Sequence, residues 1–445
     1  MPVFNYESVV NAPLSSVFAW HRRPGAIQRL IPPWAPARVQ REAHNLEVGE
    51  RARVSVGPIP IESVHTALTE PHEGQASFVD ELRKGPIKQW RHHHEFTEQP
   101  EGTLVRDTVK WSAPWIPDAL IKKQLTRMFT YRHHQLATDL AVQGDIKPMT
   151  IAITGASGLL GRQLTAFLTT GGHTVVRLVR RQPRTSDEIQ WDPTQGTIDA
   201  QALTSCDAVV HLAGEPLFGR WSRSKMRKIR KSRLDGTELI ARTLAELDEG
   251  PKTLIGASAI GYYASTSEPI DEDGPKGTGF LADLVEDWEN ATALARDAGL
   301  RVVHVRTGLV LSPRGGFLGL QLPPFHAGLG GWLGNGRQML SWIAQDDIVY
   351  LLHHALTNSK VRGVLNMTSP HPVTGREFAR TLAKVLHRPA LIPVPLRAIE
   401  VALGKTAAEE FAGASQWVLP GKALATDYTF RYPNLQGALQ HLLGR

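Results

Sequence analysis

Three glycines at a fixed spacing are the residues of this sequence best suited to bind a ligand. They lie in residues 154–161, TGASGLLG, which follow an apolar run and open an amphipathic one. In a strand–turn–helix unit, glycines at this spacing permit a tight turn, a close approach to a pyrophosphate and close packing of helix on strand. A plain glycine-rich turn is the alternative. The predicted dinucleotide-binding residues are Gly155, Ala156, Ser157, Gly158, Leu159, Leu160 and Gly161.

The end of the next expected strand, residues 174–179, indicates which dinucleotide binds. An acidic residue there would accept a hydrogen bond from the free ribose 2′-hydroxyl of NAD, but the sequence has Arg180 and Arg181. Guanidinium groups suit the 2′-phosphate of NADP. We therefore expect NADP in preference to NAD, with a solvated basic strand end as the alternative. A later strand leads to Leu212, Ala213 and Gly214, which we expect on the adenosine side of the cofactor.

A glycine-rich segment, residues 328–342, could cover a substrate. Arg337 and Gln338 are good donors for an anionic or hydroxylated group, and Trp342 could stack on a ring. A flexible turn is the alternative for this segment. The carboxylates of Asp346 and Asp347 follow directly, and we interpret them as helix-capping groups because anions are stabilised at a helix N-terminus.

Three consecutive histidines raise the question of a metal site. His92, His93 and His94 lie in an expected strand, where neighbouring residues point to opposite faces. Only His92 and His94 can share a face, and a zinc site needs a further ligand from elsewhere. We therefore predict no metal site and interpret these histidines as sheet or cavity-lining residues.

Composition limits the function classes. The 445 residues are 42% hydrophobic and 21% charged, enough apolar material for true cores, and no apolar run is long enough to cross a membrane. Cys206 is the only cysteine, which excludes an internal disulfide; with no signal-peptide pattern at the start, a cytoplasmic location is expected. The net charge of +7 favours anionic ligands. The basic run at residues 223–233 is interpreted as a solvated helix face rather than a nucleic-acid site.

The seam GDIKP at residues 144–148 divides the chain into two expected domains. Residues 1–147 read as several strands followed by one long helix at about 117–142, an α+β arrangement. Residues 148–445 alternate strand and helix patterns, which is typical of an α/β doubly wound parallel sheet of Rossmann type. From about residue 370, a further helix, a proline-rich stretch and the tail are expected to form a small substrate lobe.

Residues 149–445 resemble an atypical extended short-chain dehydrogenase/reductase. Besides TGASGLLG, the motifs occur in order as HLAGEP, GASAIGYY, RTGLVL, GNGRQMLSWIAQDD and LPGKALATDYTFRYPNLQGAL. They are similar to the epimerase-like subgroup with a C-terminal extension, which is often labelled a nucleoside-diphosphate-sugar epimerase or a SulA-like cell-division inhibitor. The resemblance implies NAD(P) bound across the carboxyl ends of the strands.

The first 148 residues are similar to the START-like polyketide cyclase superfamily, also called SRPBCC. The resemblance rests on the segment FAWHRRPGAIQRLIPPW and on the long helix that ends the domain. It implies a helix-grip fold, in which a curved antiparallel sheet wraps a helix around an apolar cavity. A hydrophobic ligand of unknown identity is therefore expected there.

The resemblance also implies a catalytic serine and a YxxxK pair, which this chain lacks in part. None of the five tyrosines after residue 149 has lysine four residues further on, and the expected place reads GFLADL at residues 279–284. Ser258 lies where the family's serine is expected, and Tyr262 follows it by four residues. We therefore expect Ser258 and Tyr262 to be catalytic, and the alternative is that they only line the pocket.

Two readings of function follow. The first is an NADP-dependent oxidoreductase or epimerase-like enzyme acting on a small substrate, either a nucleotide sugar or a hydrophobic carbonyl compound, with a hydrophobic ligand held by the N-terminal domain. The second is a non-catalytic NADP-binding regulator or a carrier of hydrophobic ligands. No nucleic-acid or membrane partner is expected.

Overall fold

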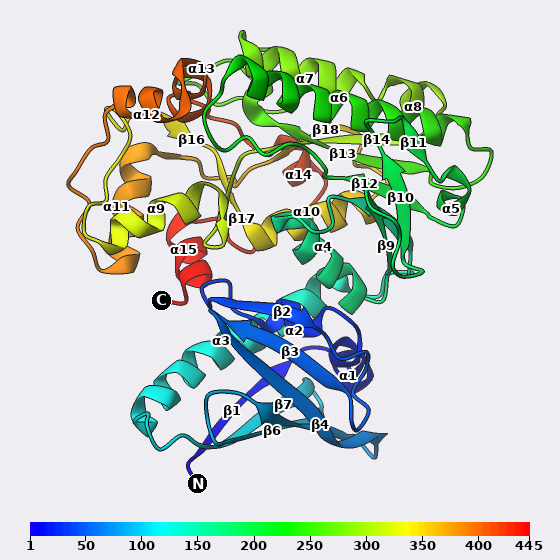
Figure 1. Cartoon of the computed structure of the whole chain (residues 1–445), viewed down its shortest axis with the longest axis vertical. Coiled ribbons are helices and arrows are strands. Elements are labelled where there is room, and N and C mark those ends of the chain that lie inside the picture. The colour runs from blue at the N-terminus through cyan, green and yellow to red at the C-terminus, as the bar shows by residue number, and fades with distance from the viewer. The chain divides into compact units, whose positions relative to one another are not determined.

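The computed structural model describes all residues, 1–445, and the chain divides into two compact units (Figure 1). The first unit contains residues 1–148, 165–174 and Gly444, and the second contains residues 149–164, 175–443 and Arg445. None of the helices combines the length and hydropathy that a membrane-spanning segment requires.

The first unit is built on one antiparallel sheet of seven strands in the order β1-β7-β6-β5-β4-β3-β2. The strands are β1 Val3–Val10, β2 Ala37–Arg41, β3 Arg51–Val56, β4 Ile59–His72, β5 Gln75–Lys84, β6 Gln89–Gln99 and β7 Gly102–Ser112. The helices are α1 Leu14–Arg22, α2 Ala26–Leu30 and α3 Asp118–Gln143.

Burial alternates along the strands of this sheet and shows which residues lie on its inner face. On β6, residues 92, 94 and 96 are buried while their neighbours are more exposed, so His92 and His94 share the inner face as expected. Helix α3 begins after Pro117 and ends at Gly144, whose N–H donates to the carbonyl of Leu140. The inner face is not wholly apolar, because buried histidines and aspartates accompany its apolar clusters.

The second unit is built on an eight-stranded sheet in the order β11-β10-β9-β8-β12-β13-β14-β18. The strands are β8 Thr150–Thr154, β9 Thr174–Val179, β10 Glu188–Asp192, β11 Thr197–Ile198, β12 Ala208–His211, β13 Thr253–Ala259, β14 Arg301–Thr307 and β18 Gly363–Met367. The register is parallel between β8 and β12 and onward to β18, while β11 is antiparallel to β10. The Rossmann-type parallel sheet expected from the sequence is confirmed.

Helices cover both faces of this sheet, with α6 and α7 on one side and α4 and α10 on the other (Figure 1). The helices are α4 Leu159–Thr170, α5 Ala200–Leu203, α6 Arg223–Glu246, η1 Ile260–Tyr262, α7 Phe280–Asn290, α8 Ala293–Asp297, α9 Gly316–His326, α10 Gln345–Thr357, α11 Gly375–Leu386, α12 Leu396–Leu403, α13 Lys405–Ala407, η2 Ala408–Ala412, α14 Gly421–Ala425 and α15 Leu435–Leu443. Two small sheets pair β15 Leu309–Ser312 with β17 Trp342–Ala344 and β16 Met339–Leu340 with β19 Val373–Thr374.

The strand order reverses between β8 and β12, which fixes where a ligand can bind. Chain connections leave β8 toward β9 on one side and return to β12 on the other, so a crevice opens outside the carboxyl ends of these two strands. Thr154, the last residue of β8, is the register partner of His211, the last residue of β12. The predicted glycine turn and Leu212 to Gly214 therefore emerge side by side.

Asp347 connects the first turn of α10 to the C-terminal segment of the chain. The side chain is fully buried and accepts hydrogen bonds from the Tyr428 hydroxyl at 3.2 Å and from the backbone N–H groups of Arg431 and Tyr432 at 2.8 and 2.9 Å. Asp346 contacts an imidazole of α15. Both carboxylates lie in the first turn of α10, as the sequence predicted, and both also bond to partners more than 80 positions later in the chain.

Replacing Asp347 by Asn should make the stability of the protein less dependent on pH. Burial raises the pKa of Asp347 to about 6, although hydrogen bonds from the tail oppose the rise. A raised folded-state pKa stabilises the protein below the unfolded pKa of about 3.9, and this contribution is lost as pH rises through about 6. As pH rises from about 3.9 to about 6, the unfolding free energy of the variant should increase relative to that of the wild type by up to about 3 kcal/mol.

Urea midpoints of both proteins across this pH range provide the measurement. Comparing the variant with wild type at each pH cancels the titration of all other groups. Parallel curves for the two proteins would contradict a raised pKa at Asp347.

Candidate functional site

The turn after β8 has a backbone path that only glycine accommodates. Gly155 has φ of 69°, in the left-handed region, and a Cβ there would lie 2.9 Å from the backbone nitrogen of Ala213. A Cβ on Gly161 would lie 2.2 Å from the carbonyl oxygen of Gly155. Helix α4 can therefore begin directly over the end of β8 only because these side chains are absent.

The open side of this turn can receive an anion. Ser157 and Gly158 are exposed at the point where α4 begins, and the first N–H groups of a helix have no partner inside it. The Gly158 N–H donates to the Gly155 carbonyl oxygen at 2.9 Å, and a Cβ on Gly158 would lie 3.1 Å from the same oxygen. Oriented amides and the helix dipole together favour phosphate. The residues present fit a dinucleotide pyrophosphate.

Thr154 connects the glycine turn to the segment after β12. Its hydroxyl oxygen accepts hydrogen bonds from the backbone N–H groups of Leu212 and Ala213, each at 3.1 Å, and lies 2.8 Å from Nδ1 of His211. Burial, with the charge of Arg233, lowers the pKa of His211 to about 4. A neutral imidazole thus supports the two predicted cofactor segments, and the structure brings residues 155–161 and 212–214 together.

The two arginines at the end of β9 differ in their partners. Arg181 donates to both carboxylate oxygens of Glu188, at 2.7 and 2.6 Å. Hydrogen bonds from Arg181 and from the Arg184 backbone lower the pKa of Glu188 to about 2. Arg180 is exposed and makes no hydrogen bond or ion pair within the chain. Arg180 is therefore the guanidinium group that is available to a ligand.

Ser258 belongs to a buried charged group that the sequence did not reveal. Its hydroxyl donates to Oε1 of Glu289 on α7 at 2.6 Å. Arg306 of β14 donates to both oxygens of the same carboxylate at 2.8 Å. The RTGLVL motif contains Arg306 and could have drawn attention to it, whereas nothing in the sequence distinguishes Glu289 from its acidic neighbours. The hydroxyl hydrogen of Ser258 is therefore already bonded to Glu289.

Arg306 also lies against the two tyrosines of the GASAIGYY motif. Its guanidinium carbon is 3.5 Å from the ring centre of Tyr262 and 4.8 Å from that of Tyr263. Tyr263 donates to Asn366 at 2.8 Å, and burial raises its pKa to about 12. The Tyr262 hydroxyl makes no hydrogen bond within the chain. Of the two, Tyr262 has the hydroxyl that can act on a ligand.

No lysine takes the place of the family's missing lysine. Lys276 forms a backbone bridge with Tyr263, but its ammonium group is 2.8 Å from Asp283 and 2.7 Å from Glu286 on α7. These carboxylates hold it by hydrogen bonds that raise its pKa. Arg306 is therefore the cation nearest to the Tyr262 ring.

The three predicted substrate-binding residues differ in exposure and in their contacts. Trp342 has no exposed surface, packs in a core cluster of the second unit and donates to the carbonyl of His371 at 3.0 Å. The prediction that it stacks on a ligand is wrong, because core side chains cover its ring. Gln338 donates to the carbonyl of Leu333 at 3.2 Å, which is a structural role. Arg337 is exposed and its guanidinium group has no partner in the chain.

Family comparisons match three parts of the chain. The NAD dependent epimerase/dehydratase family matches residues 151–367, and a domain of unknown function (DUF1731) matches residues 394–442. Residues 8–140 match a second domain of unknown function (DUF8410). The START-like resemblance of the first unit therefore stays a prediction.

Individual proteins are similar over one or both units. An epimerase family protein of Mycobacterium tuberculosis is 42% identical over 297 residues, which cover 66% of this chain and 98% of the relative. The crystal structure of human SDR39U1 (isoform 2) with NADPH is 34% identical with a TM-score of 0.61, covering 66% of this chain and 99% of that one.

The crystal structure of the nucleoside-diphosphate sugar epimerase from Corynebacterium glutamicum extends the similarity to both units. It is 35% identical with a TM-score of 0.84, and the match covers 99% of this chain and 90% of that one. The glycine turn at the β8/β12 crevice and these matches over nearly the whole length of the relatives lead to one conclusion. The chain belongs to the NAD dependent epimerase/dehydratase family.

Proposed function

We propose that the chain is an NADP(H)-dependent oxidoreductase or epimerase. The observation that carries this proposal is the glycine turn, where Gly155 and Gly161 let the N-terminus of α4 approach the end of β8 within reach of a pyrophosphate. The human relative whose structure contains NADPH supports the same cofactor. Residues 155–161 would hold the pyrophosphate, and Leu212, Ala213 and Gly214 would lie on the adenosine side.

Arg180 would select the phosphorylated dinucleotide. It lies directly after β9, the strand whose end meets the adenosine ribose in this fold. It makes no hydrogen bond or salt bridge within the chain, and Asp192 is the carboxylate that interacts with its charge. Arg181 would contribute less, since Glu188 already occupies its guanidinium group. A free guanidinium group binds a 2′-phosphate through charge-assisted hydrogen bonds.

The proposed chemistry needs a proton donor and acceptor beside the nicotinamide, which supplies or accepts a hydride when bound. Tyr262 would take the proton of a substrate hydroxyl during oxidation, or give its own proton to a substrate carbonyl oxygen during reduction. Arg306, 3.5 Å from its ring centre, would stabilise the negative charge that develops on the phenol oxygen. The Ser258 hydroxyl would donate its hydrogen bond to Glu289 and would position the substrate by accepting a hydrogen bond from it.

A nucleotide sugar is the substrate class we favour. The Corynebacterium structure, which matches both units, is described as a nucleoside-diphosphate sugar epimerase. The exposed guanidinium group of Arg337 would suit a diphosphate. The absence of YxxxK supports the second candidate, a non-catalytic NADP-binding regulator.

For the first unit, the antiparallel sheet followed by the long helix α3 supports the helix-grip assignment. A hydrophobic ligand for this unit, and a role as a carrier of such ligands, stay predictions. Analysis of small molecules that copurify with the native chain would test both.

Replacing Arg180 by Ala should weaken NADPH binding without changing NADH binding. A charge-assisted contact with the 2′-phosphate contributes about 1.5–3 kcal/mol, which corresponds to a loss of about 10- to 100-fold in NADPH affinity. Calorimetric titration with both dinucleotides measures the effect. Arg296→Ala, an equal charge change at an exposed position of α8, serves as the control and should bind both dinucleotides as wild type does. Equal losses for NADPH and NADH would remove Arg180 from 2′-phosphate recognition.

Replacing Tyr262 by Phe should lower turnover by at least about 100-fold, because a positioned general acid or base contributes this much. NADPH affinity should not change. Tyr263→Phe is the matched control, since Tyr263 bonds to Asn366 and should lose stability rather than catalysis. The assay is nicotinamide absorbance and product analysis over a panel of nucleotide sugars and carbonyl compounds. A wild type that binds NADPH tightly but converts nothing would favour the regulator instead.

A further inference from the structure

The strand register of the first unit gathers titratable side chains on the inner face of its sheet. Strands β5, β6 and β7 are neighbours, with Asp80 opposite His92 and Asp107 opposite His94. His92, His94 and Asp107 are each less than 9% exposed. None of these groups belongs to the dinucleotide site, which lies in the second unit.

Asp107 orients both histidines through one nitrogen of each ring. Its Oδ1 lies 2.7 Å from Nε2 of His92 and 2.7 Å from Nδ1 of His94. A carboxylate only accepts hydrogen bonds, so these two nitrogens must carry hydrogens. Nδ1 of His92 and Nε2 of His94 are then left with lone pairs in the neutral rings.

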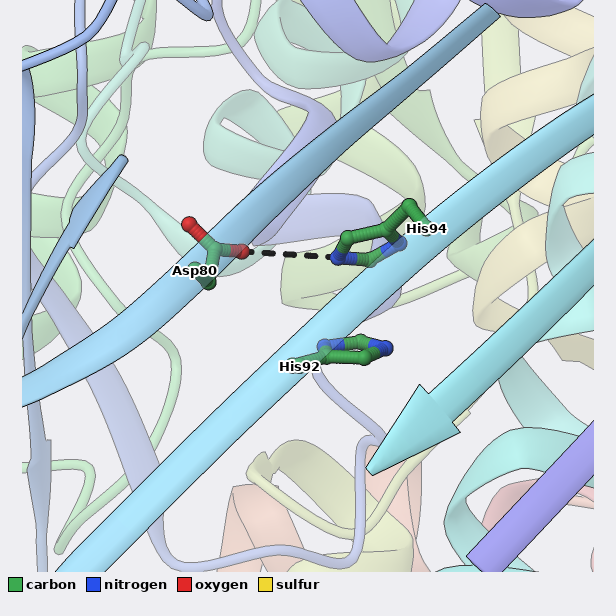
Figure 2. A group of neighbouring side chains, drawn as sticks. All are labelled: Asp80, His92 and His94. Carbon is green, nitrogen blue, oxygen red and sulfur yellow. Dashed lines mark ion pairs between the residues drawn. The ribbon is translucent and has the colours of Figure 1, made fainter. Parts of the chain in front are cut away.

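Asp80 completes a set of three donors on the other side of the rings, as Figure 2 shows. Its Oδ2 is 3.4 Å from Nε2 of His94, and its Oδ1 is 2.6 Å from Nδ1 of His65. One ligand atom each from Asp80, His92 and His94 lies within 4.8 Å of the other two. The carboxylate and both imidazoles are each fixed by a further residue.

A positive charge between the donors would stabilise this arrangement. A lone pair on Nε2 of His94 would face a carboxylate oxygen, and two like-signed electron pairs repel unless a cation lies between them. A metal ion between the donors would supply this cation.

We propose that Asp80, His92 and His94 bind a divalent transition-metal ion such as zinc. Two imidazoles with one carboxylate are a common set for such ions, and imidazole nitrogens favour them over magnesium and calcium. Ligating histidines usually donate their second nitrogen to a carboxylate, which is the role of Asp107 here. With ligand bonds of about 2.1 Å in tetrahedral geometry, two ligand atoms lie about 3.4 Å apart, so donors up to 4.8 Å apart would approach each other by up to about 1.4 Å. Three protein ligands leave a coordination position open.

The sequence alone left this site without a third ligand. His92 and His94 were expected on one face, and the register of β5 supplies Asp80 from the adjacent strand. The Asp80 side chain, 22% exposed, is the member through which an ion can enter. His93 lies between the two ligands but points to the opposite face, with its side chain 33% exposed.

The test uses the full chain without an affinity tag, stripped with a chelator and titrated with Zn²⁺ and with Co²⁺. We expect about one equivalent of tightly held Zn²⁺ and visible Co²⁺ absorption bands, and no competition from Mg²⁺. The double variant His92→Asn/His94→Asn should lose at least about 100-fold in Zn²⁺ affinity, above the range for residues that only orient ligands. His93→Asn is the matched control on the same strand and should bind as wild type does.

Asp80→Asn provides a second variant that keeps the side-chain shape and removes the anionic ligand. It should weaken Zn²⁺ at least about 10-fold even where the double variant fails to fold. The proposal is overturned if the wild type releases Zn²⁺ on dialysis, since the cluster is then a hydrogen-bonded network only. Equal Zn²⁺ affinity of wild type and Asp80→Asn, or an unchanged Co²⁺ spectrum in the double variant, would also overturn it.

Discussion

The contact between the backbones of Gly155 and Gly161 is the constraint on which the cofactor site depends. A single methyl group on Gly161 would come 2.2 Å from the carbonyl oxygen of Gly155, so any side chain would push α4 away from the end of β8. The amides of the turn would then no longer face the crevice between β8 and β12. Thr154 holds Leu212 and Ala213 next to this turn, because its hydroxyl oxygen accepts hydrogen bonds from both of their backbone N–H groups.

Local signals explain what the sequence could predict. Strand β9 spans Thr174–Val179, the expected range, and α11 spans Gly375–Leu386, where a further helix was expected after about residue 370. Apolar periodicity and a capping box such as that of Thr374 and Glu377 are encoded within a few residues. Trp342 and Asp347 could not be assigned in this way. The ring of Trp342 is covered by core side chains from distant segments, and Asp347 is held by a tail more than 80 residues away.

The catalytic proposal rests on a charge that no motif spacing reveals. Arg306 comes from β14, and Glu289 holds it in place through two hydrogen bonds. Unlike lysine, arginine does not give up its proton in proteins, so it can act on Tyr262 only through its field and its contact with the ring. This difference favours a rigid electrostatic role over a proton relay through the cation. Only a tertiary contact between η1 and β14 creates the pair.

The third member of the histidine–aspartate cluster was also not predicted from the sequence, but strand pairing could have identified it. Antiparallel pairing makes Asp80 the partner of His92, and a hairpin register drawn from β5 and β6 would have found the third donor. Buried charged groups cost several kcal/mol each unless partners satisfy them. His65 supplies such a partner for Asp80, and His133 supplies one for Asp107. The proposed metal ion would place a further positive charge between Asp80 and His94.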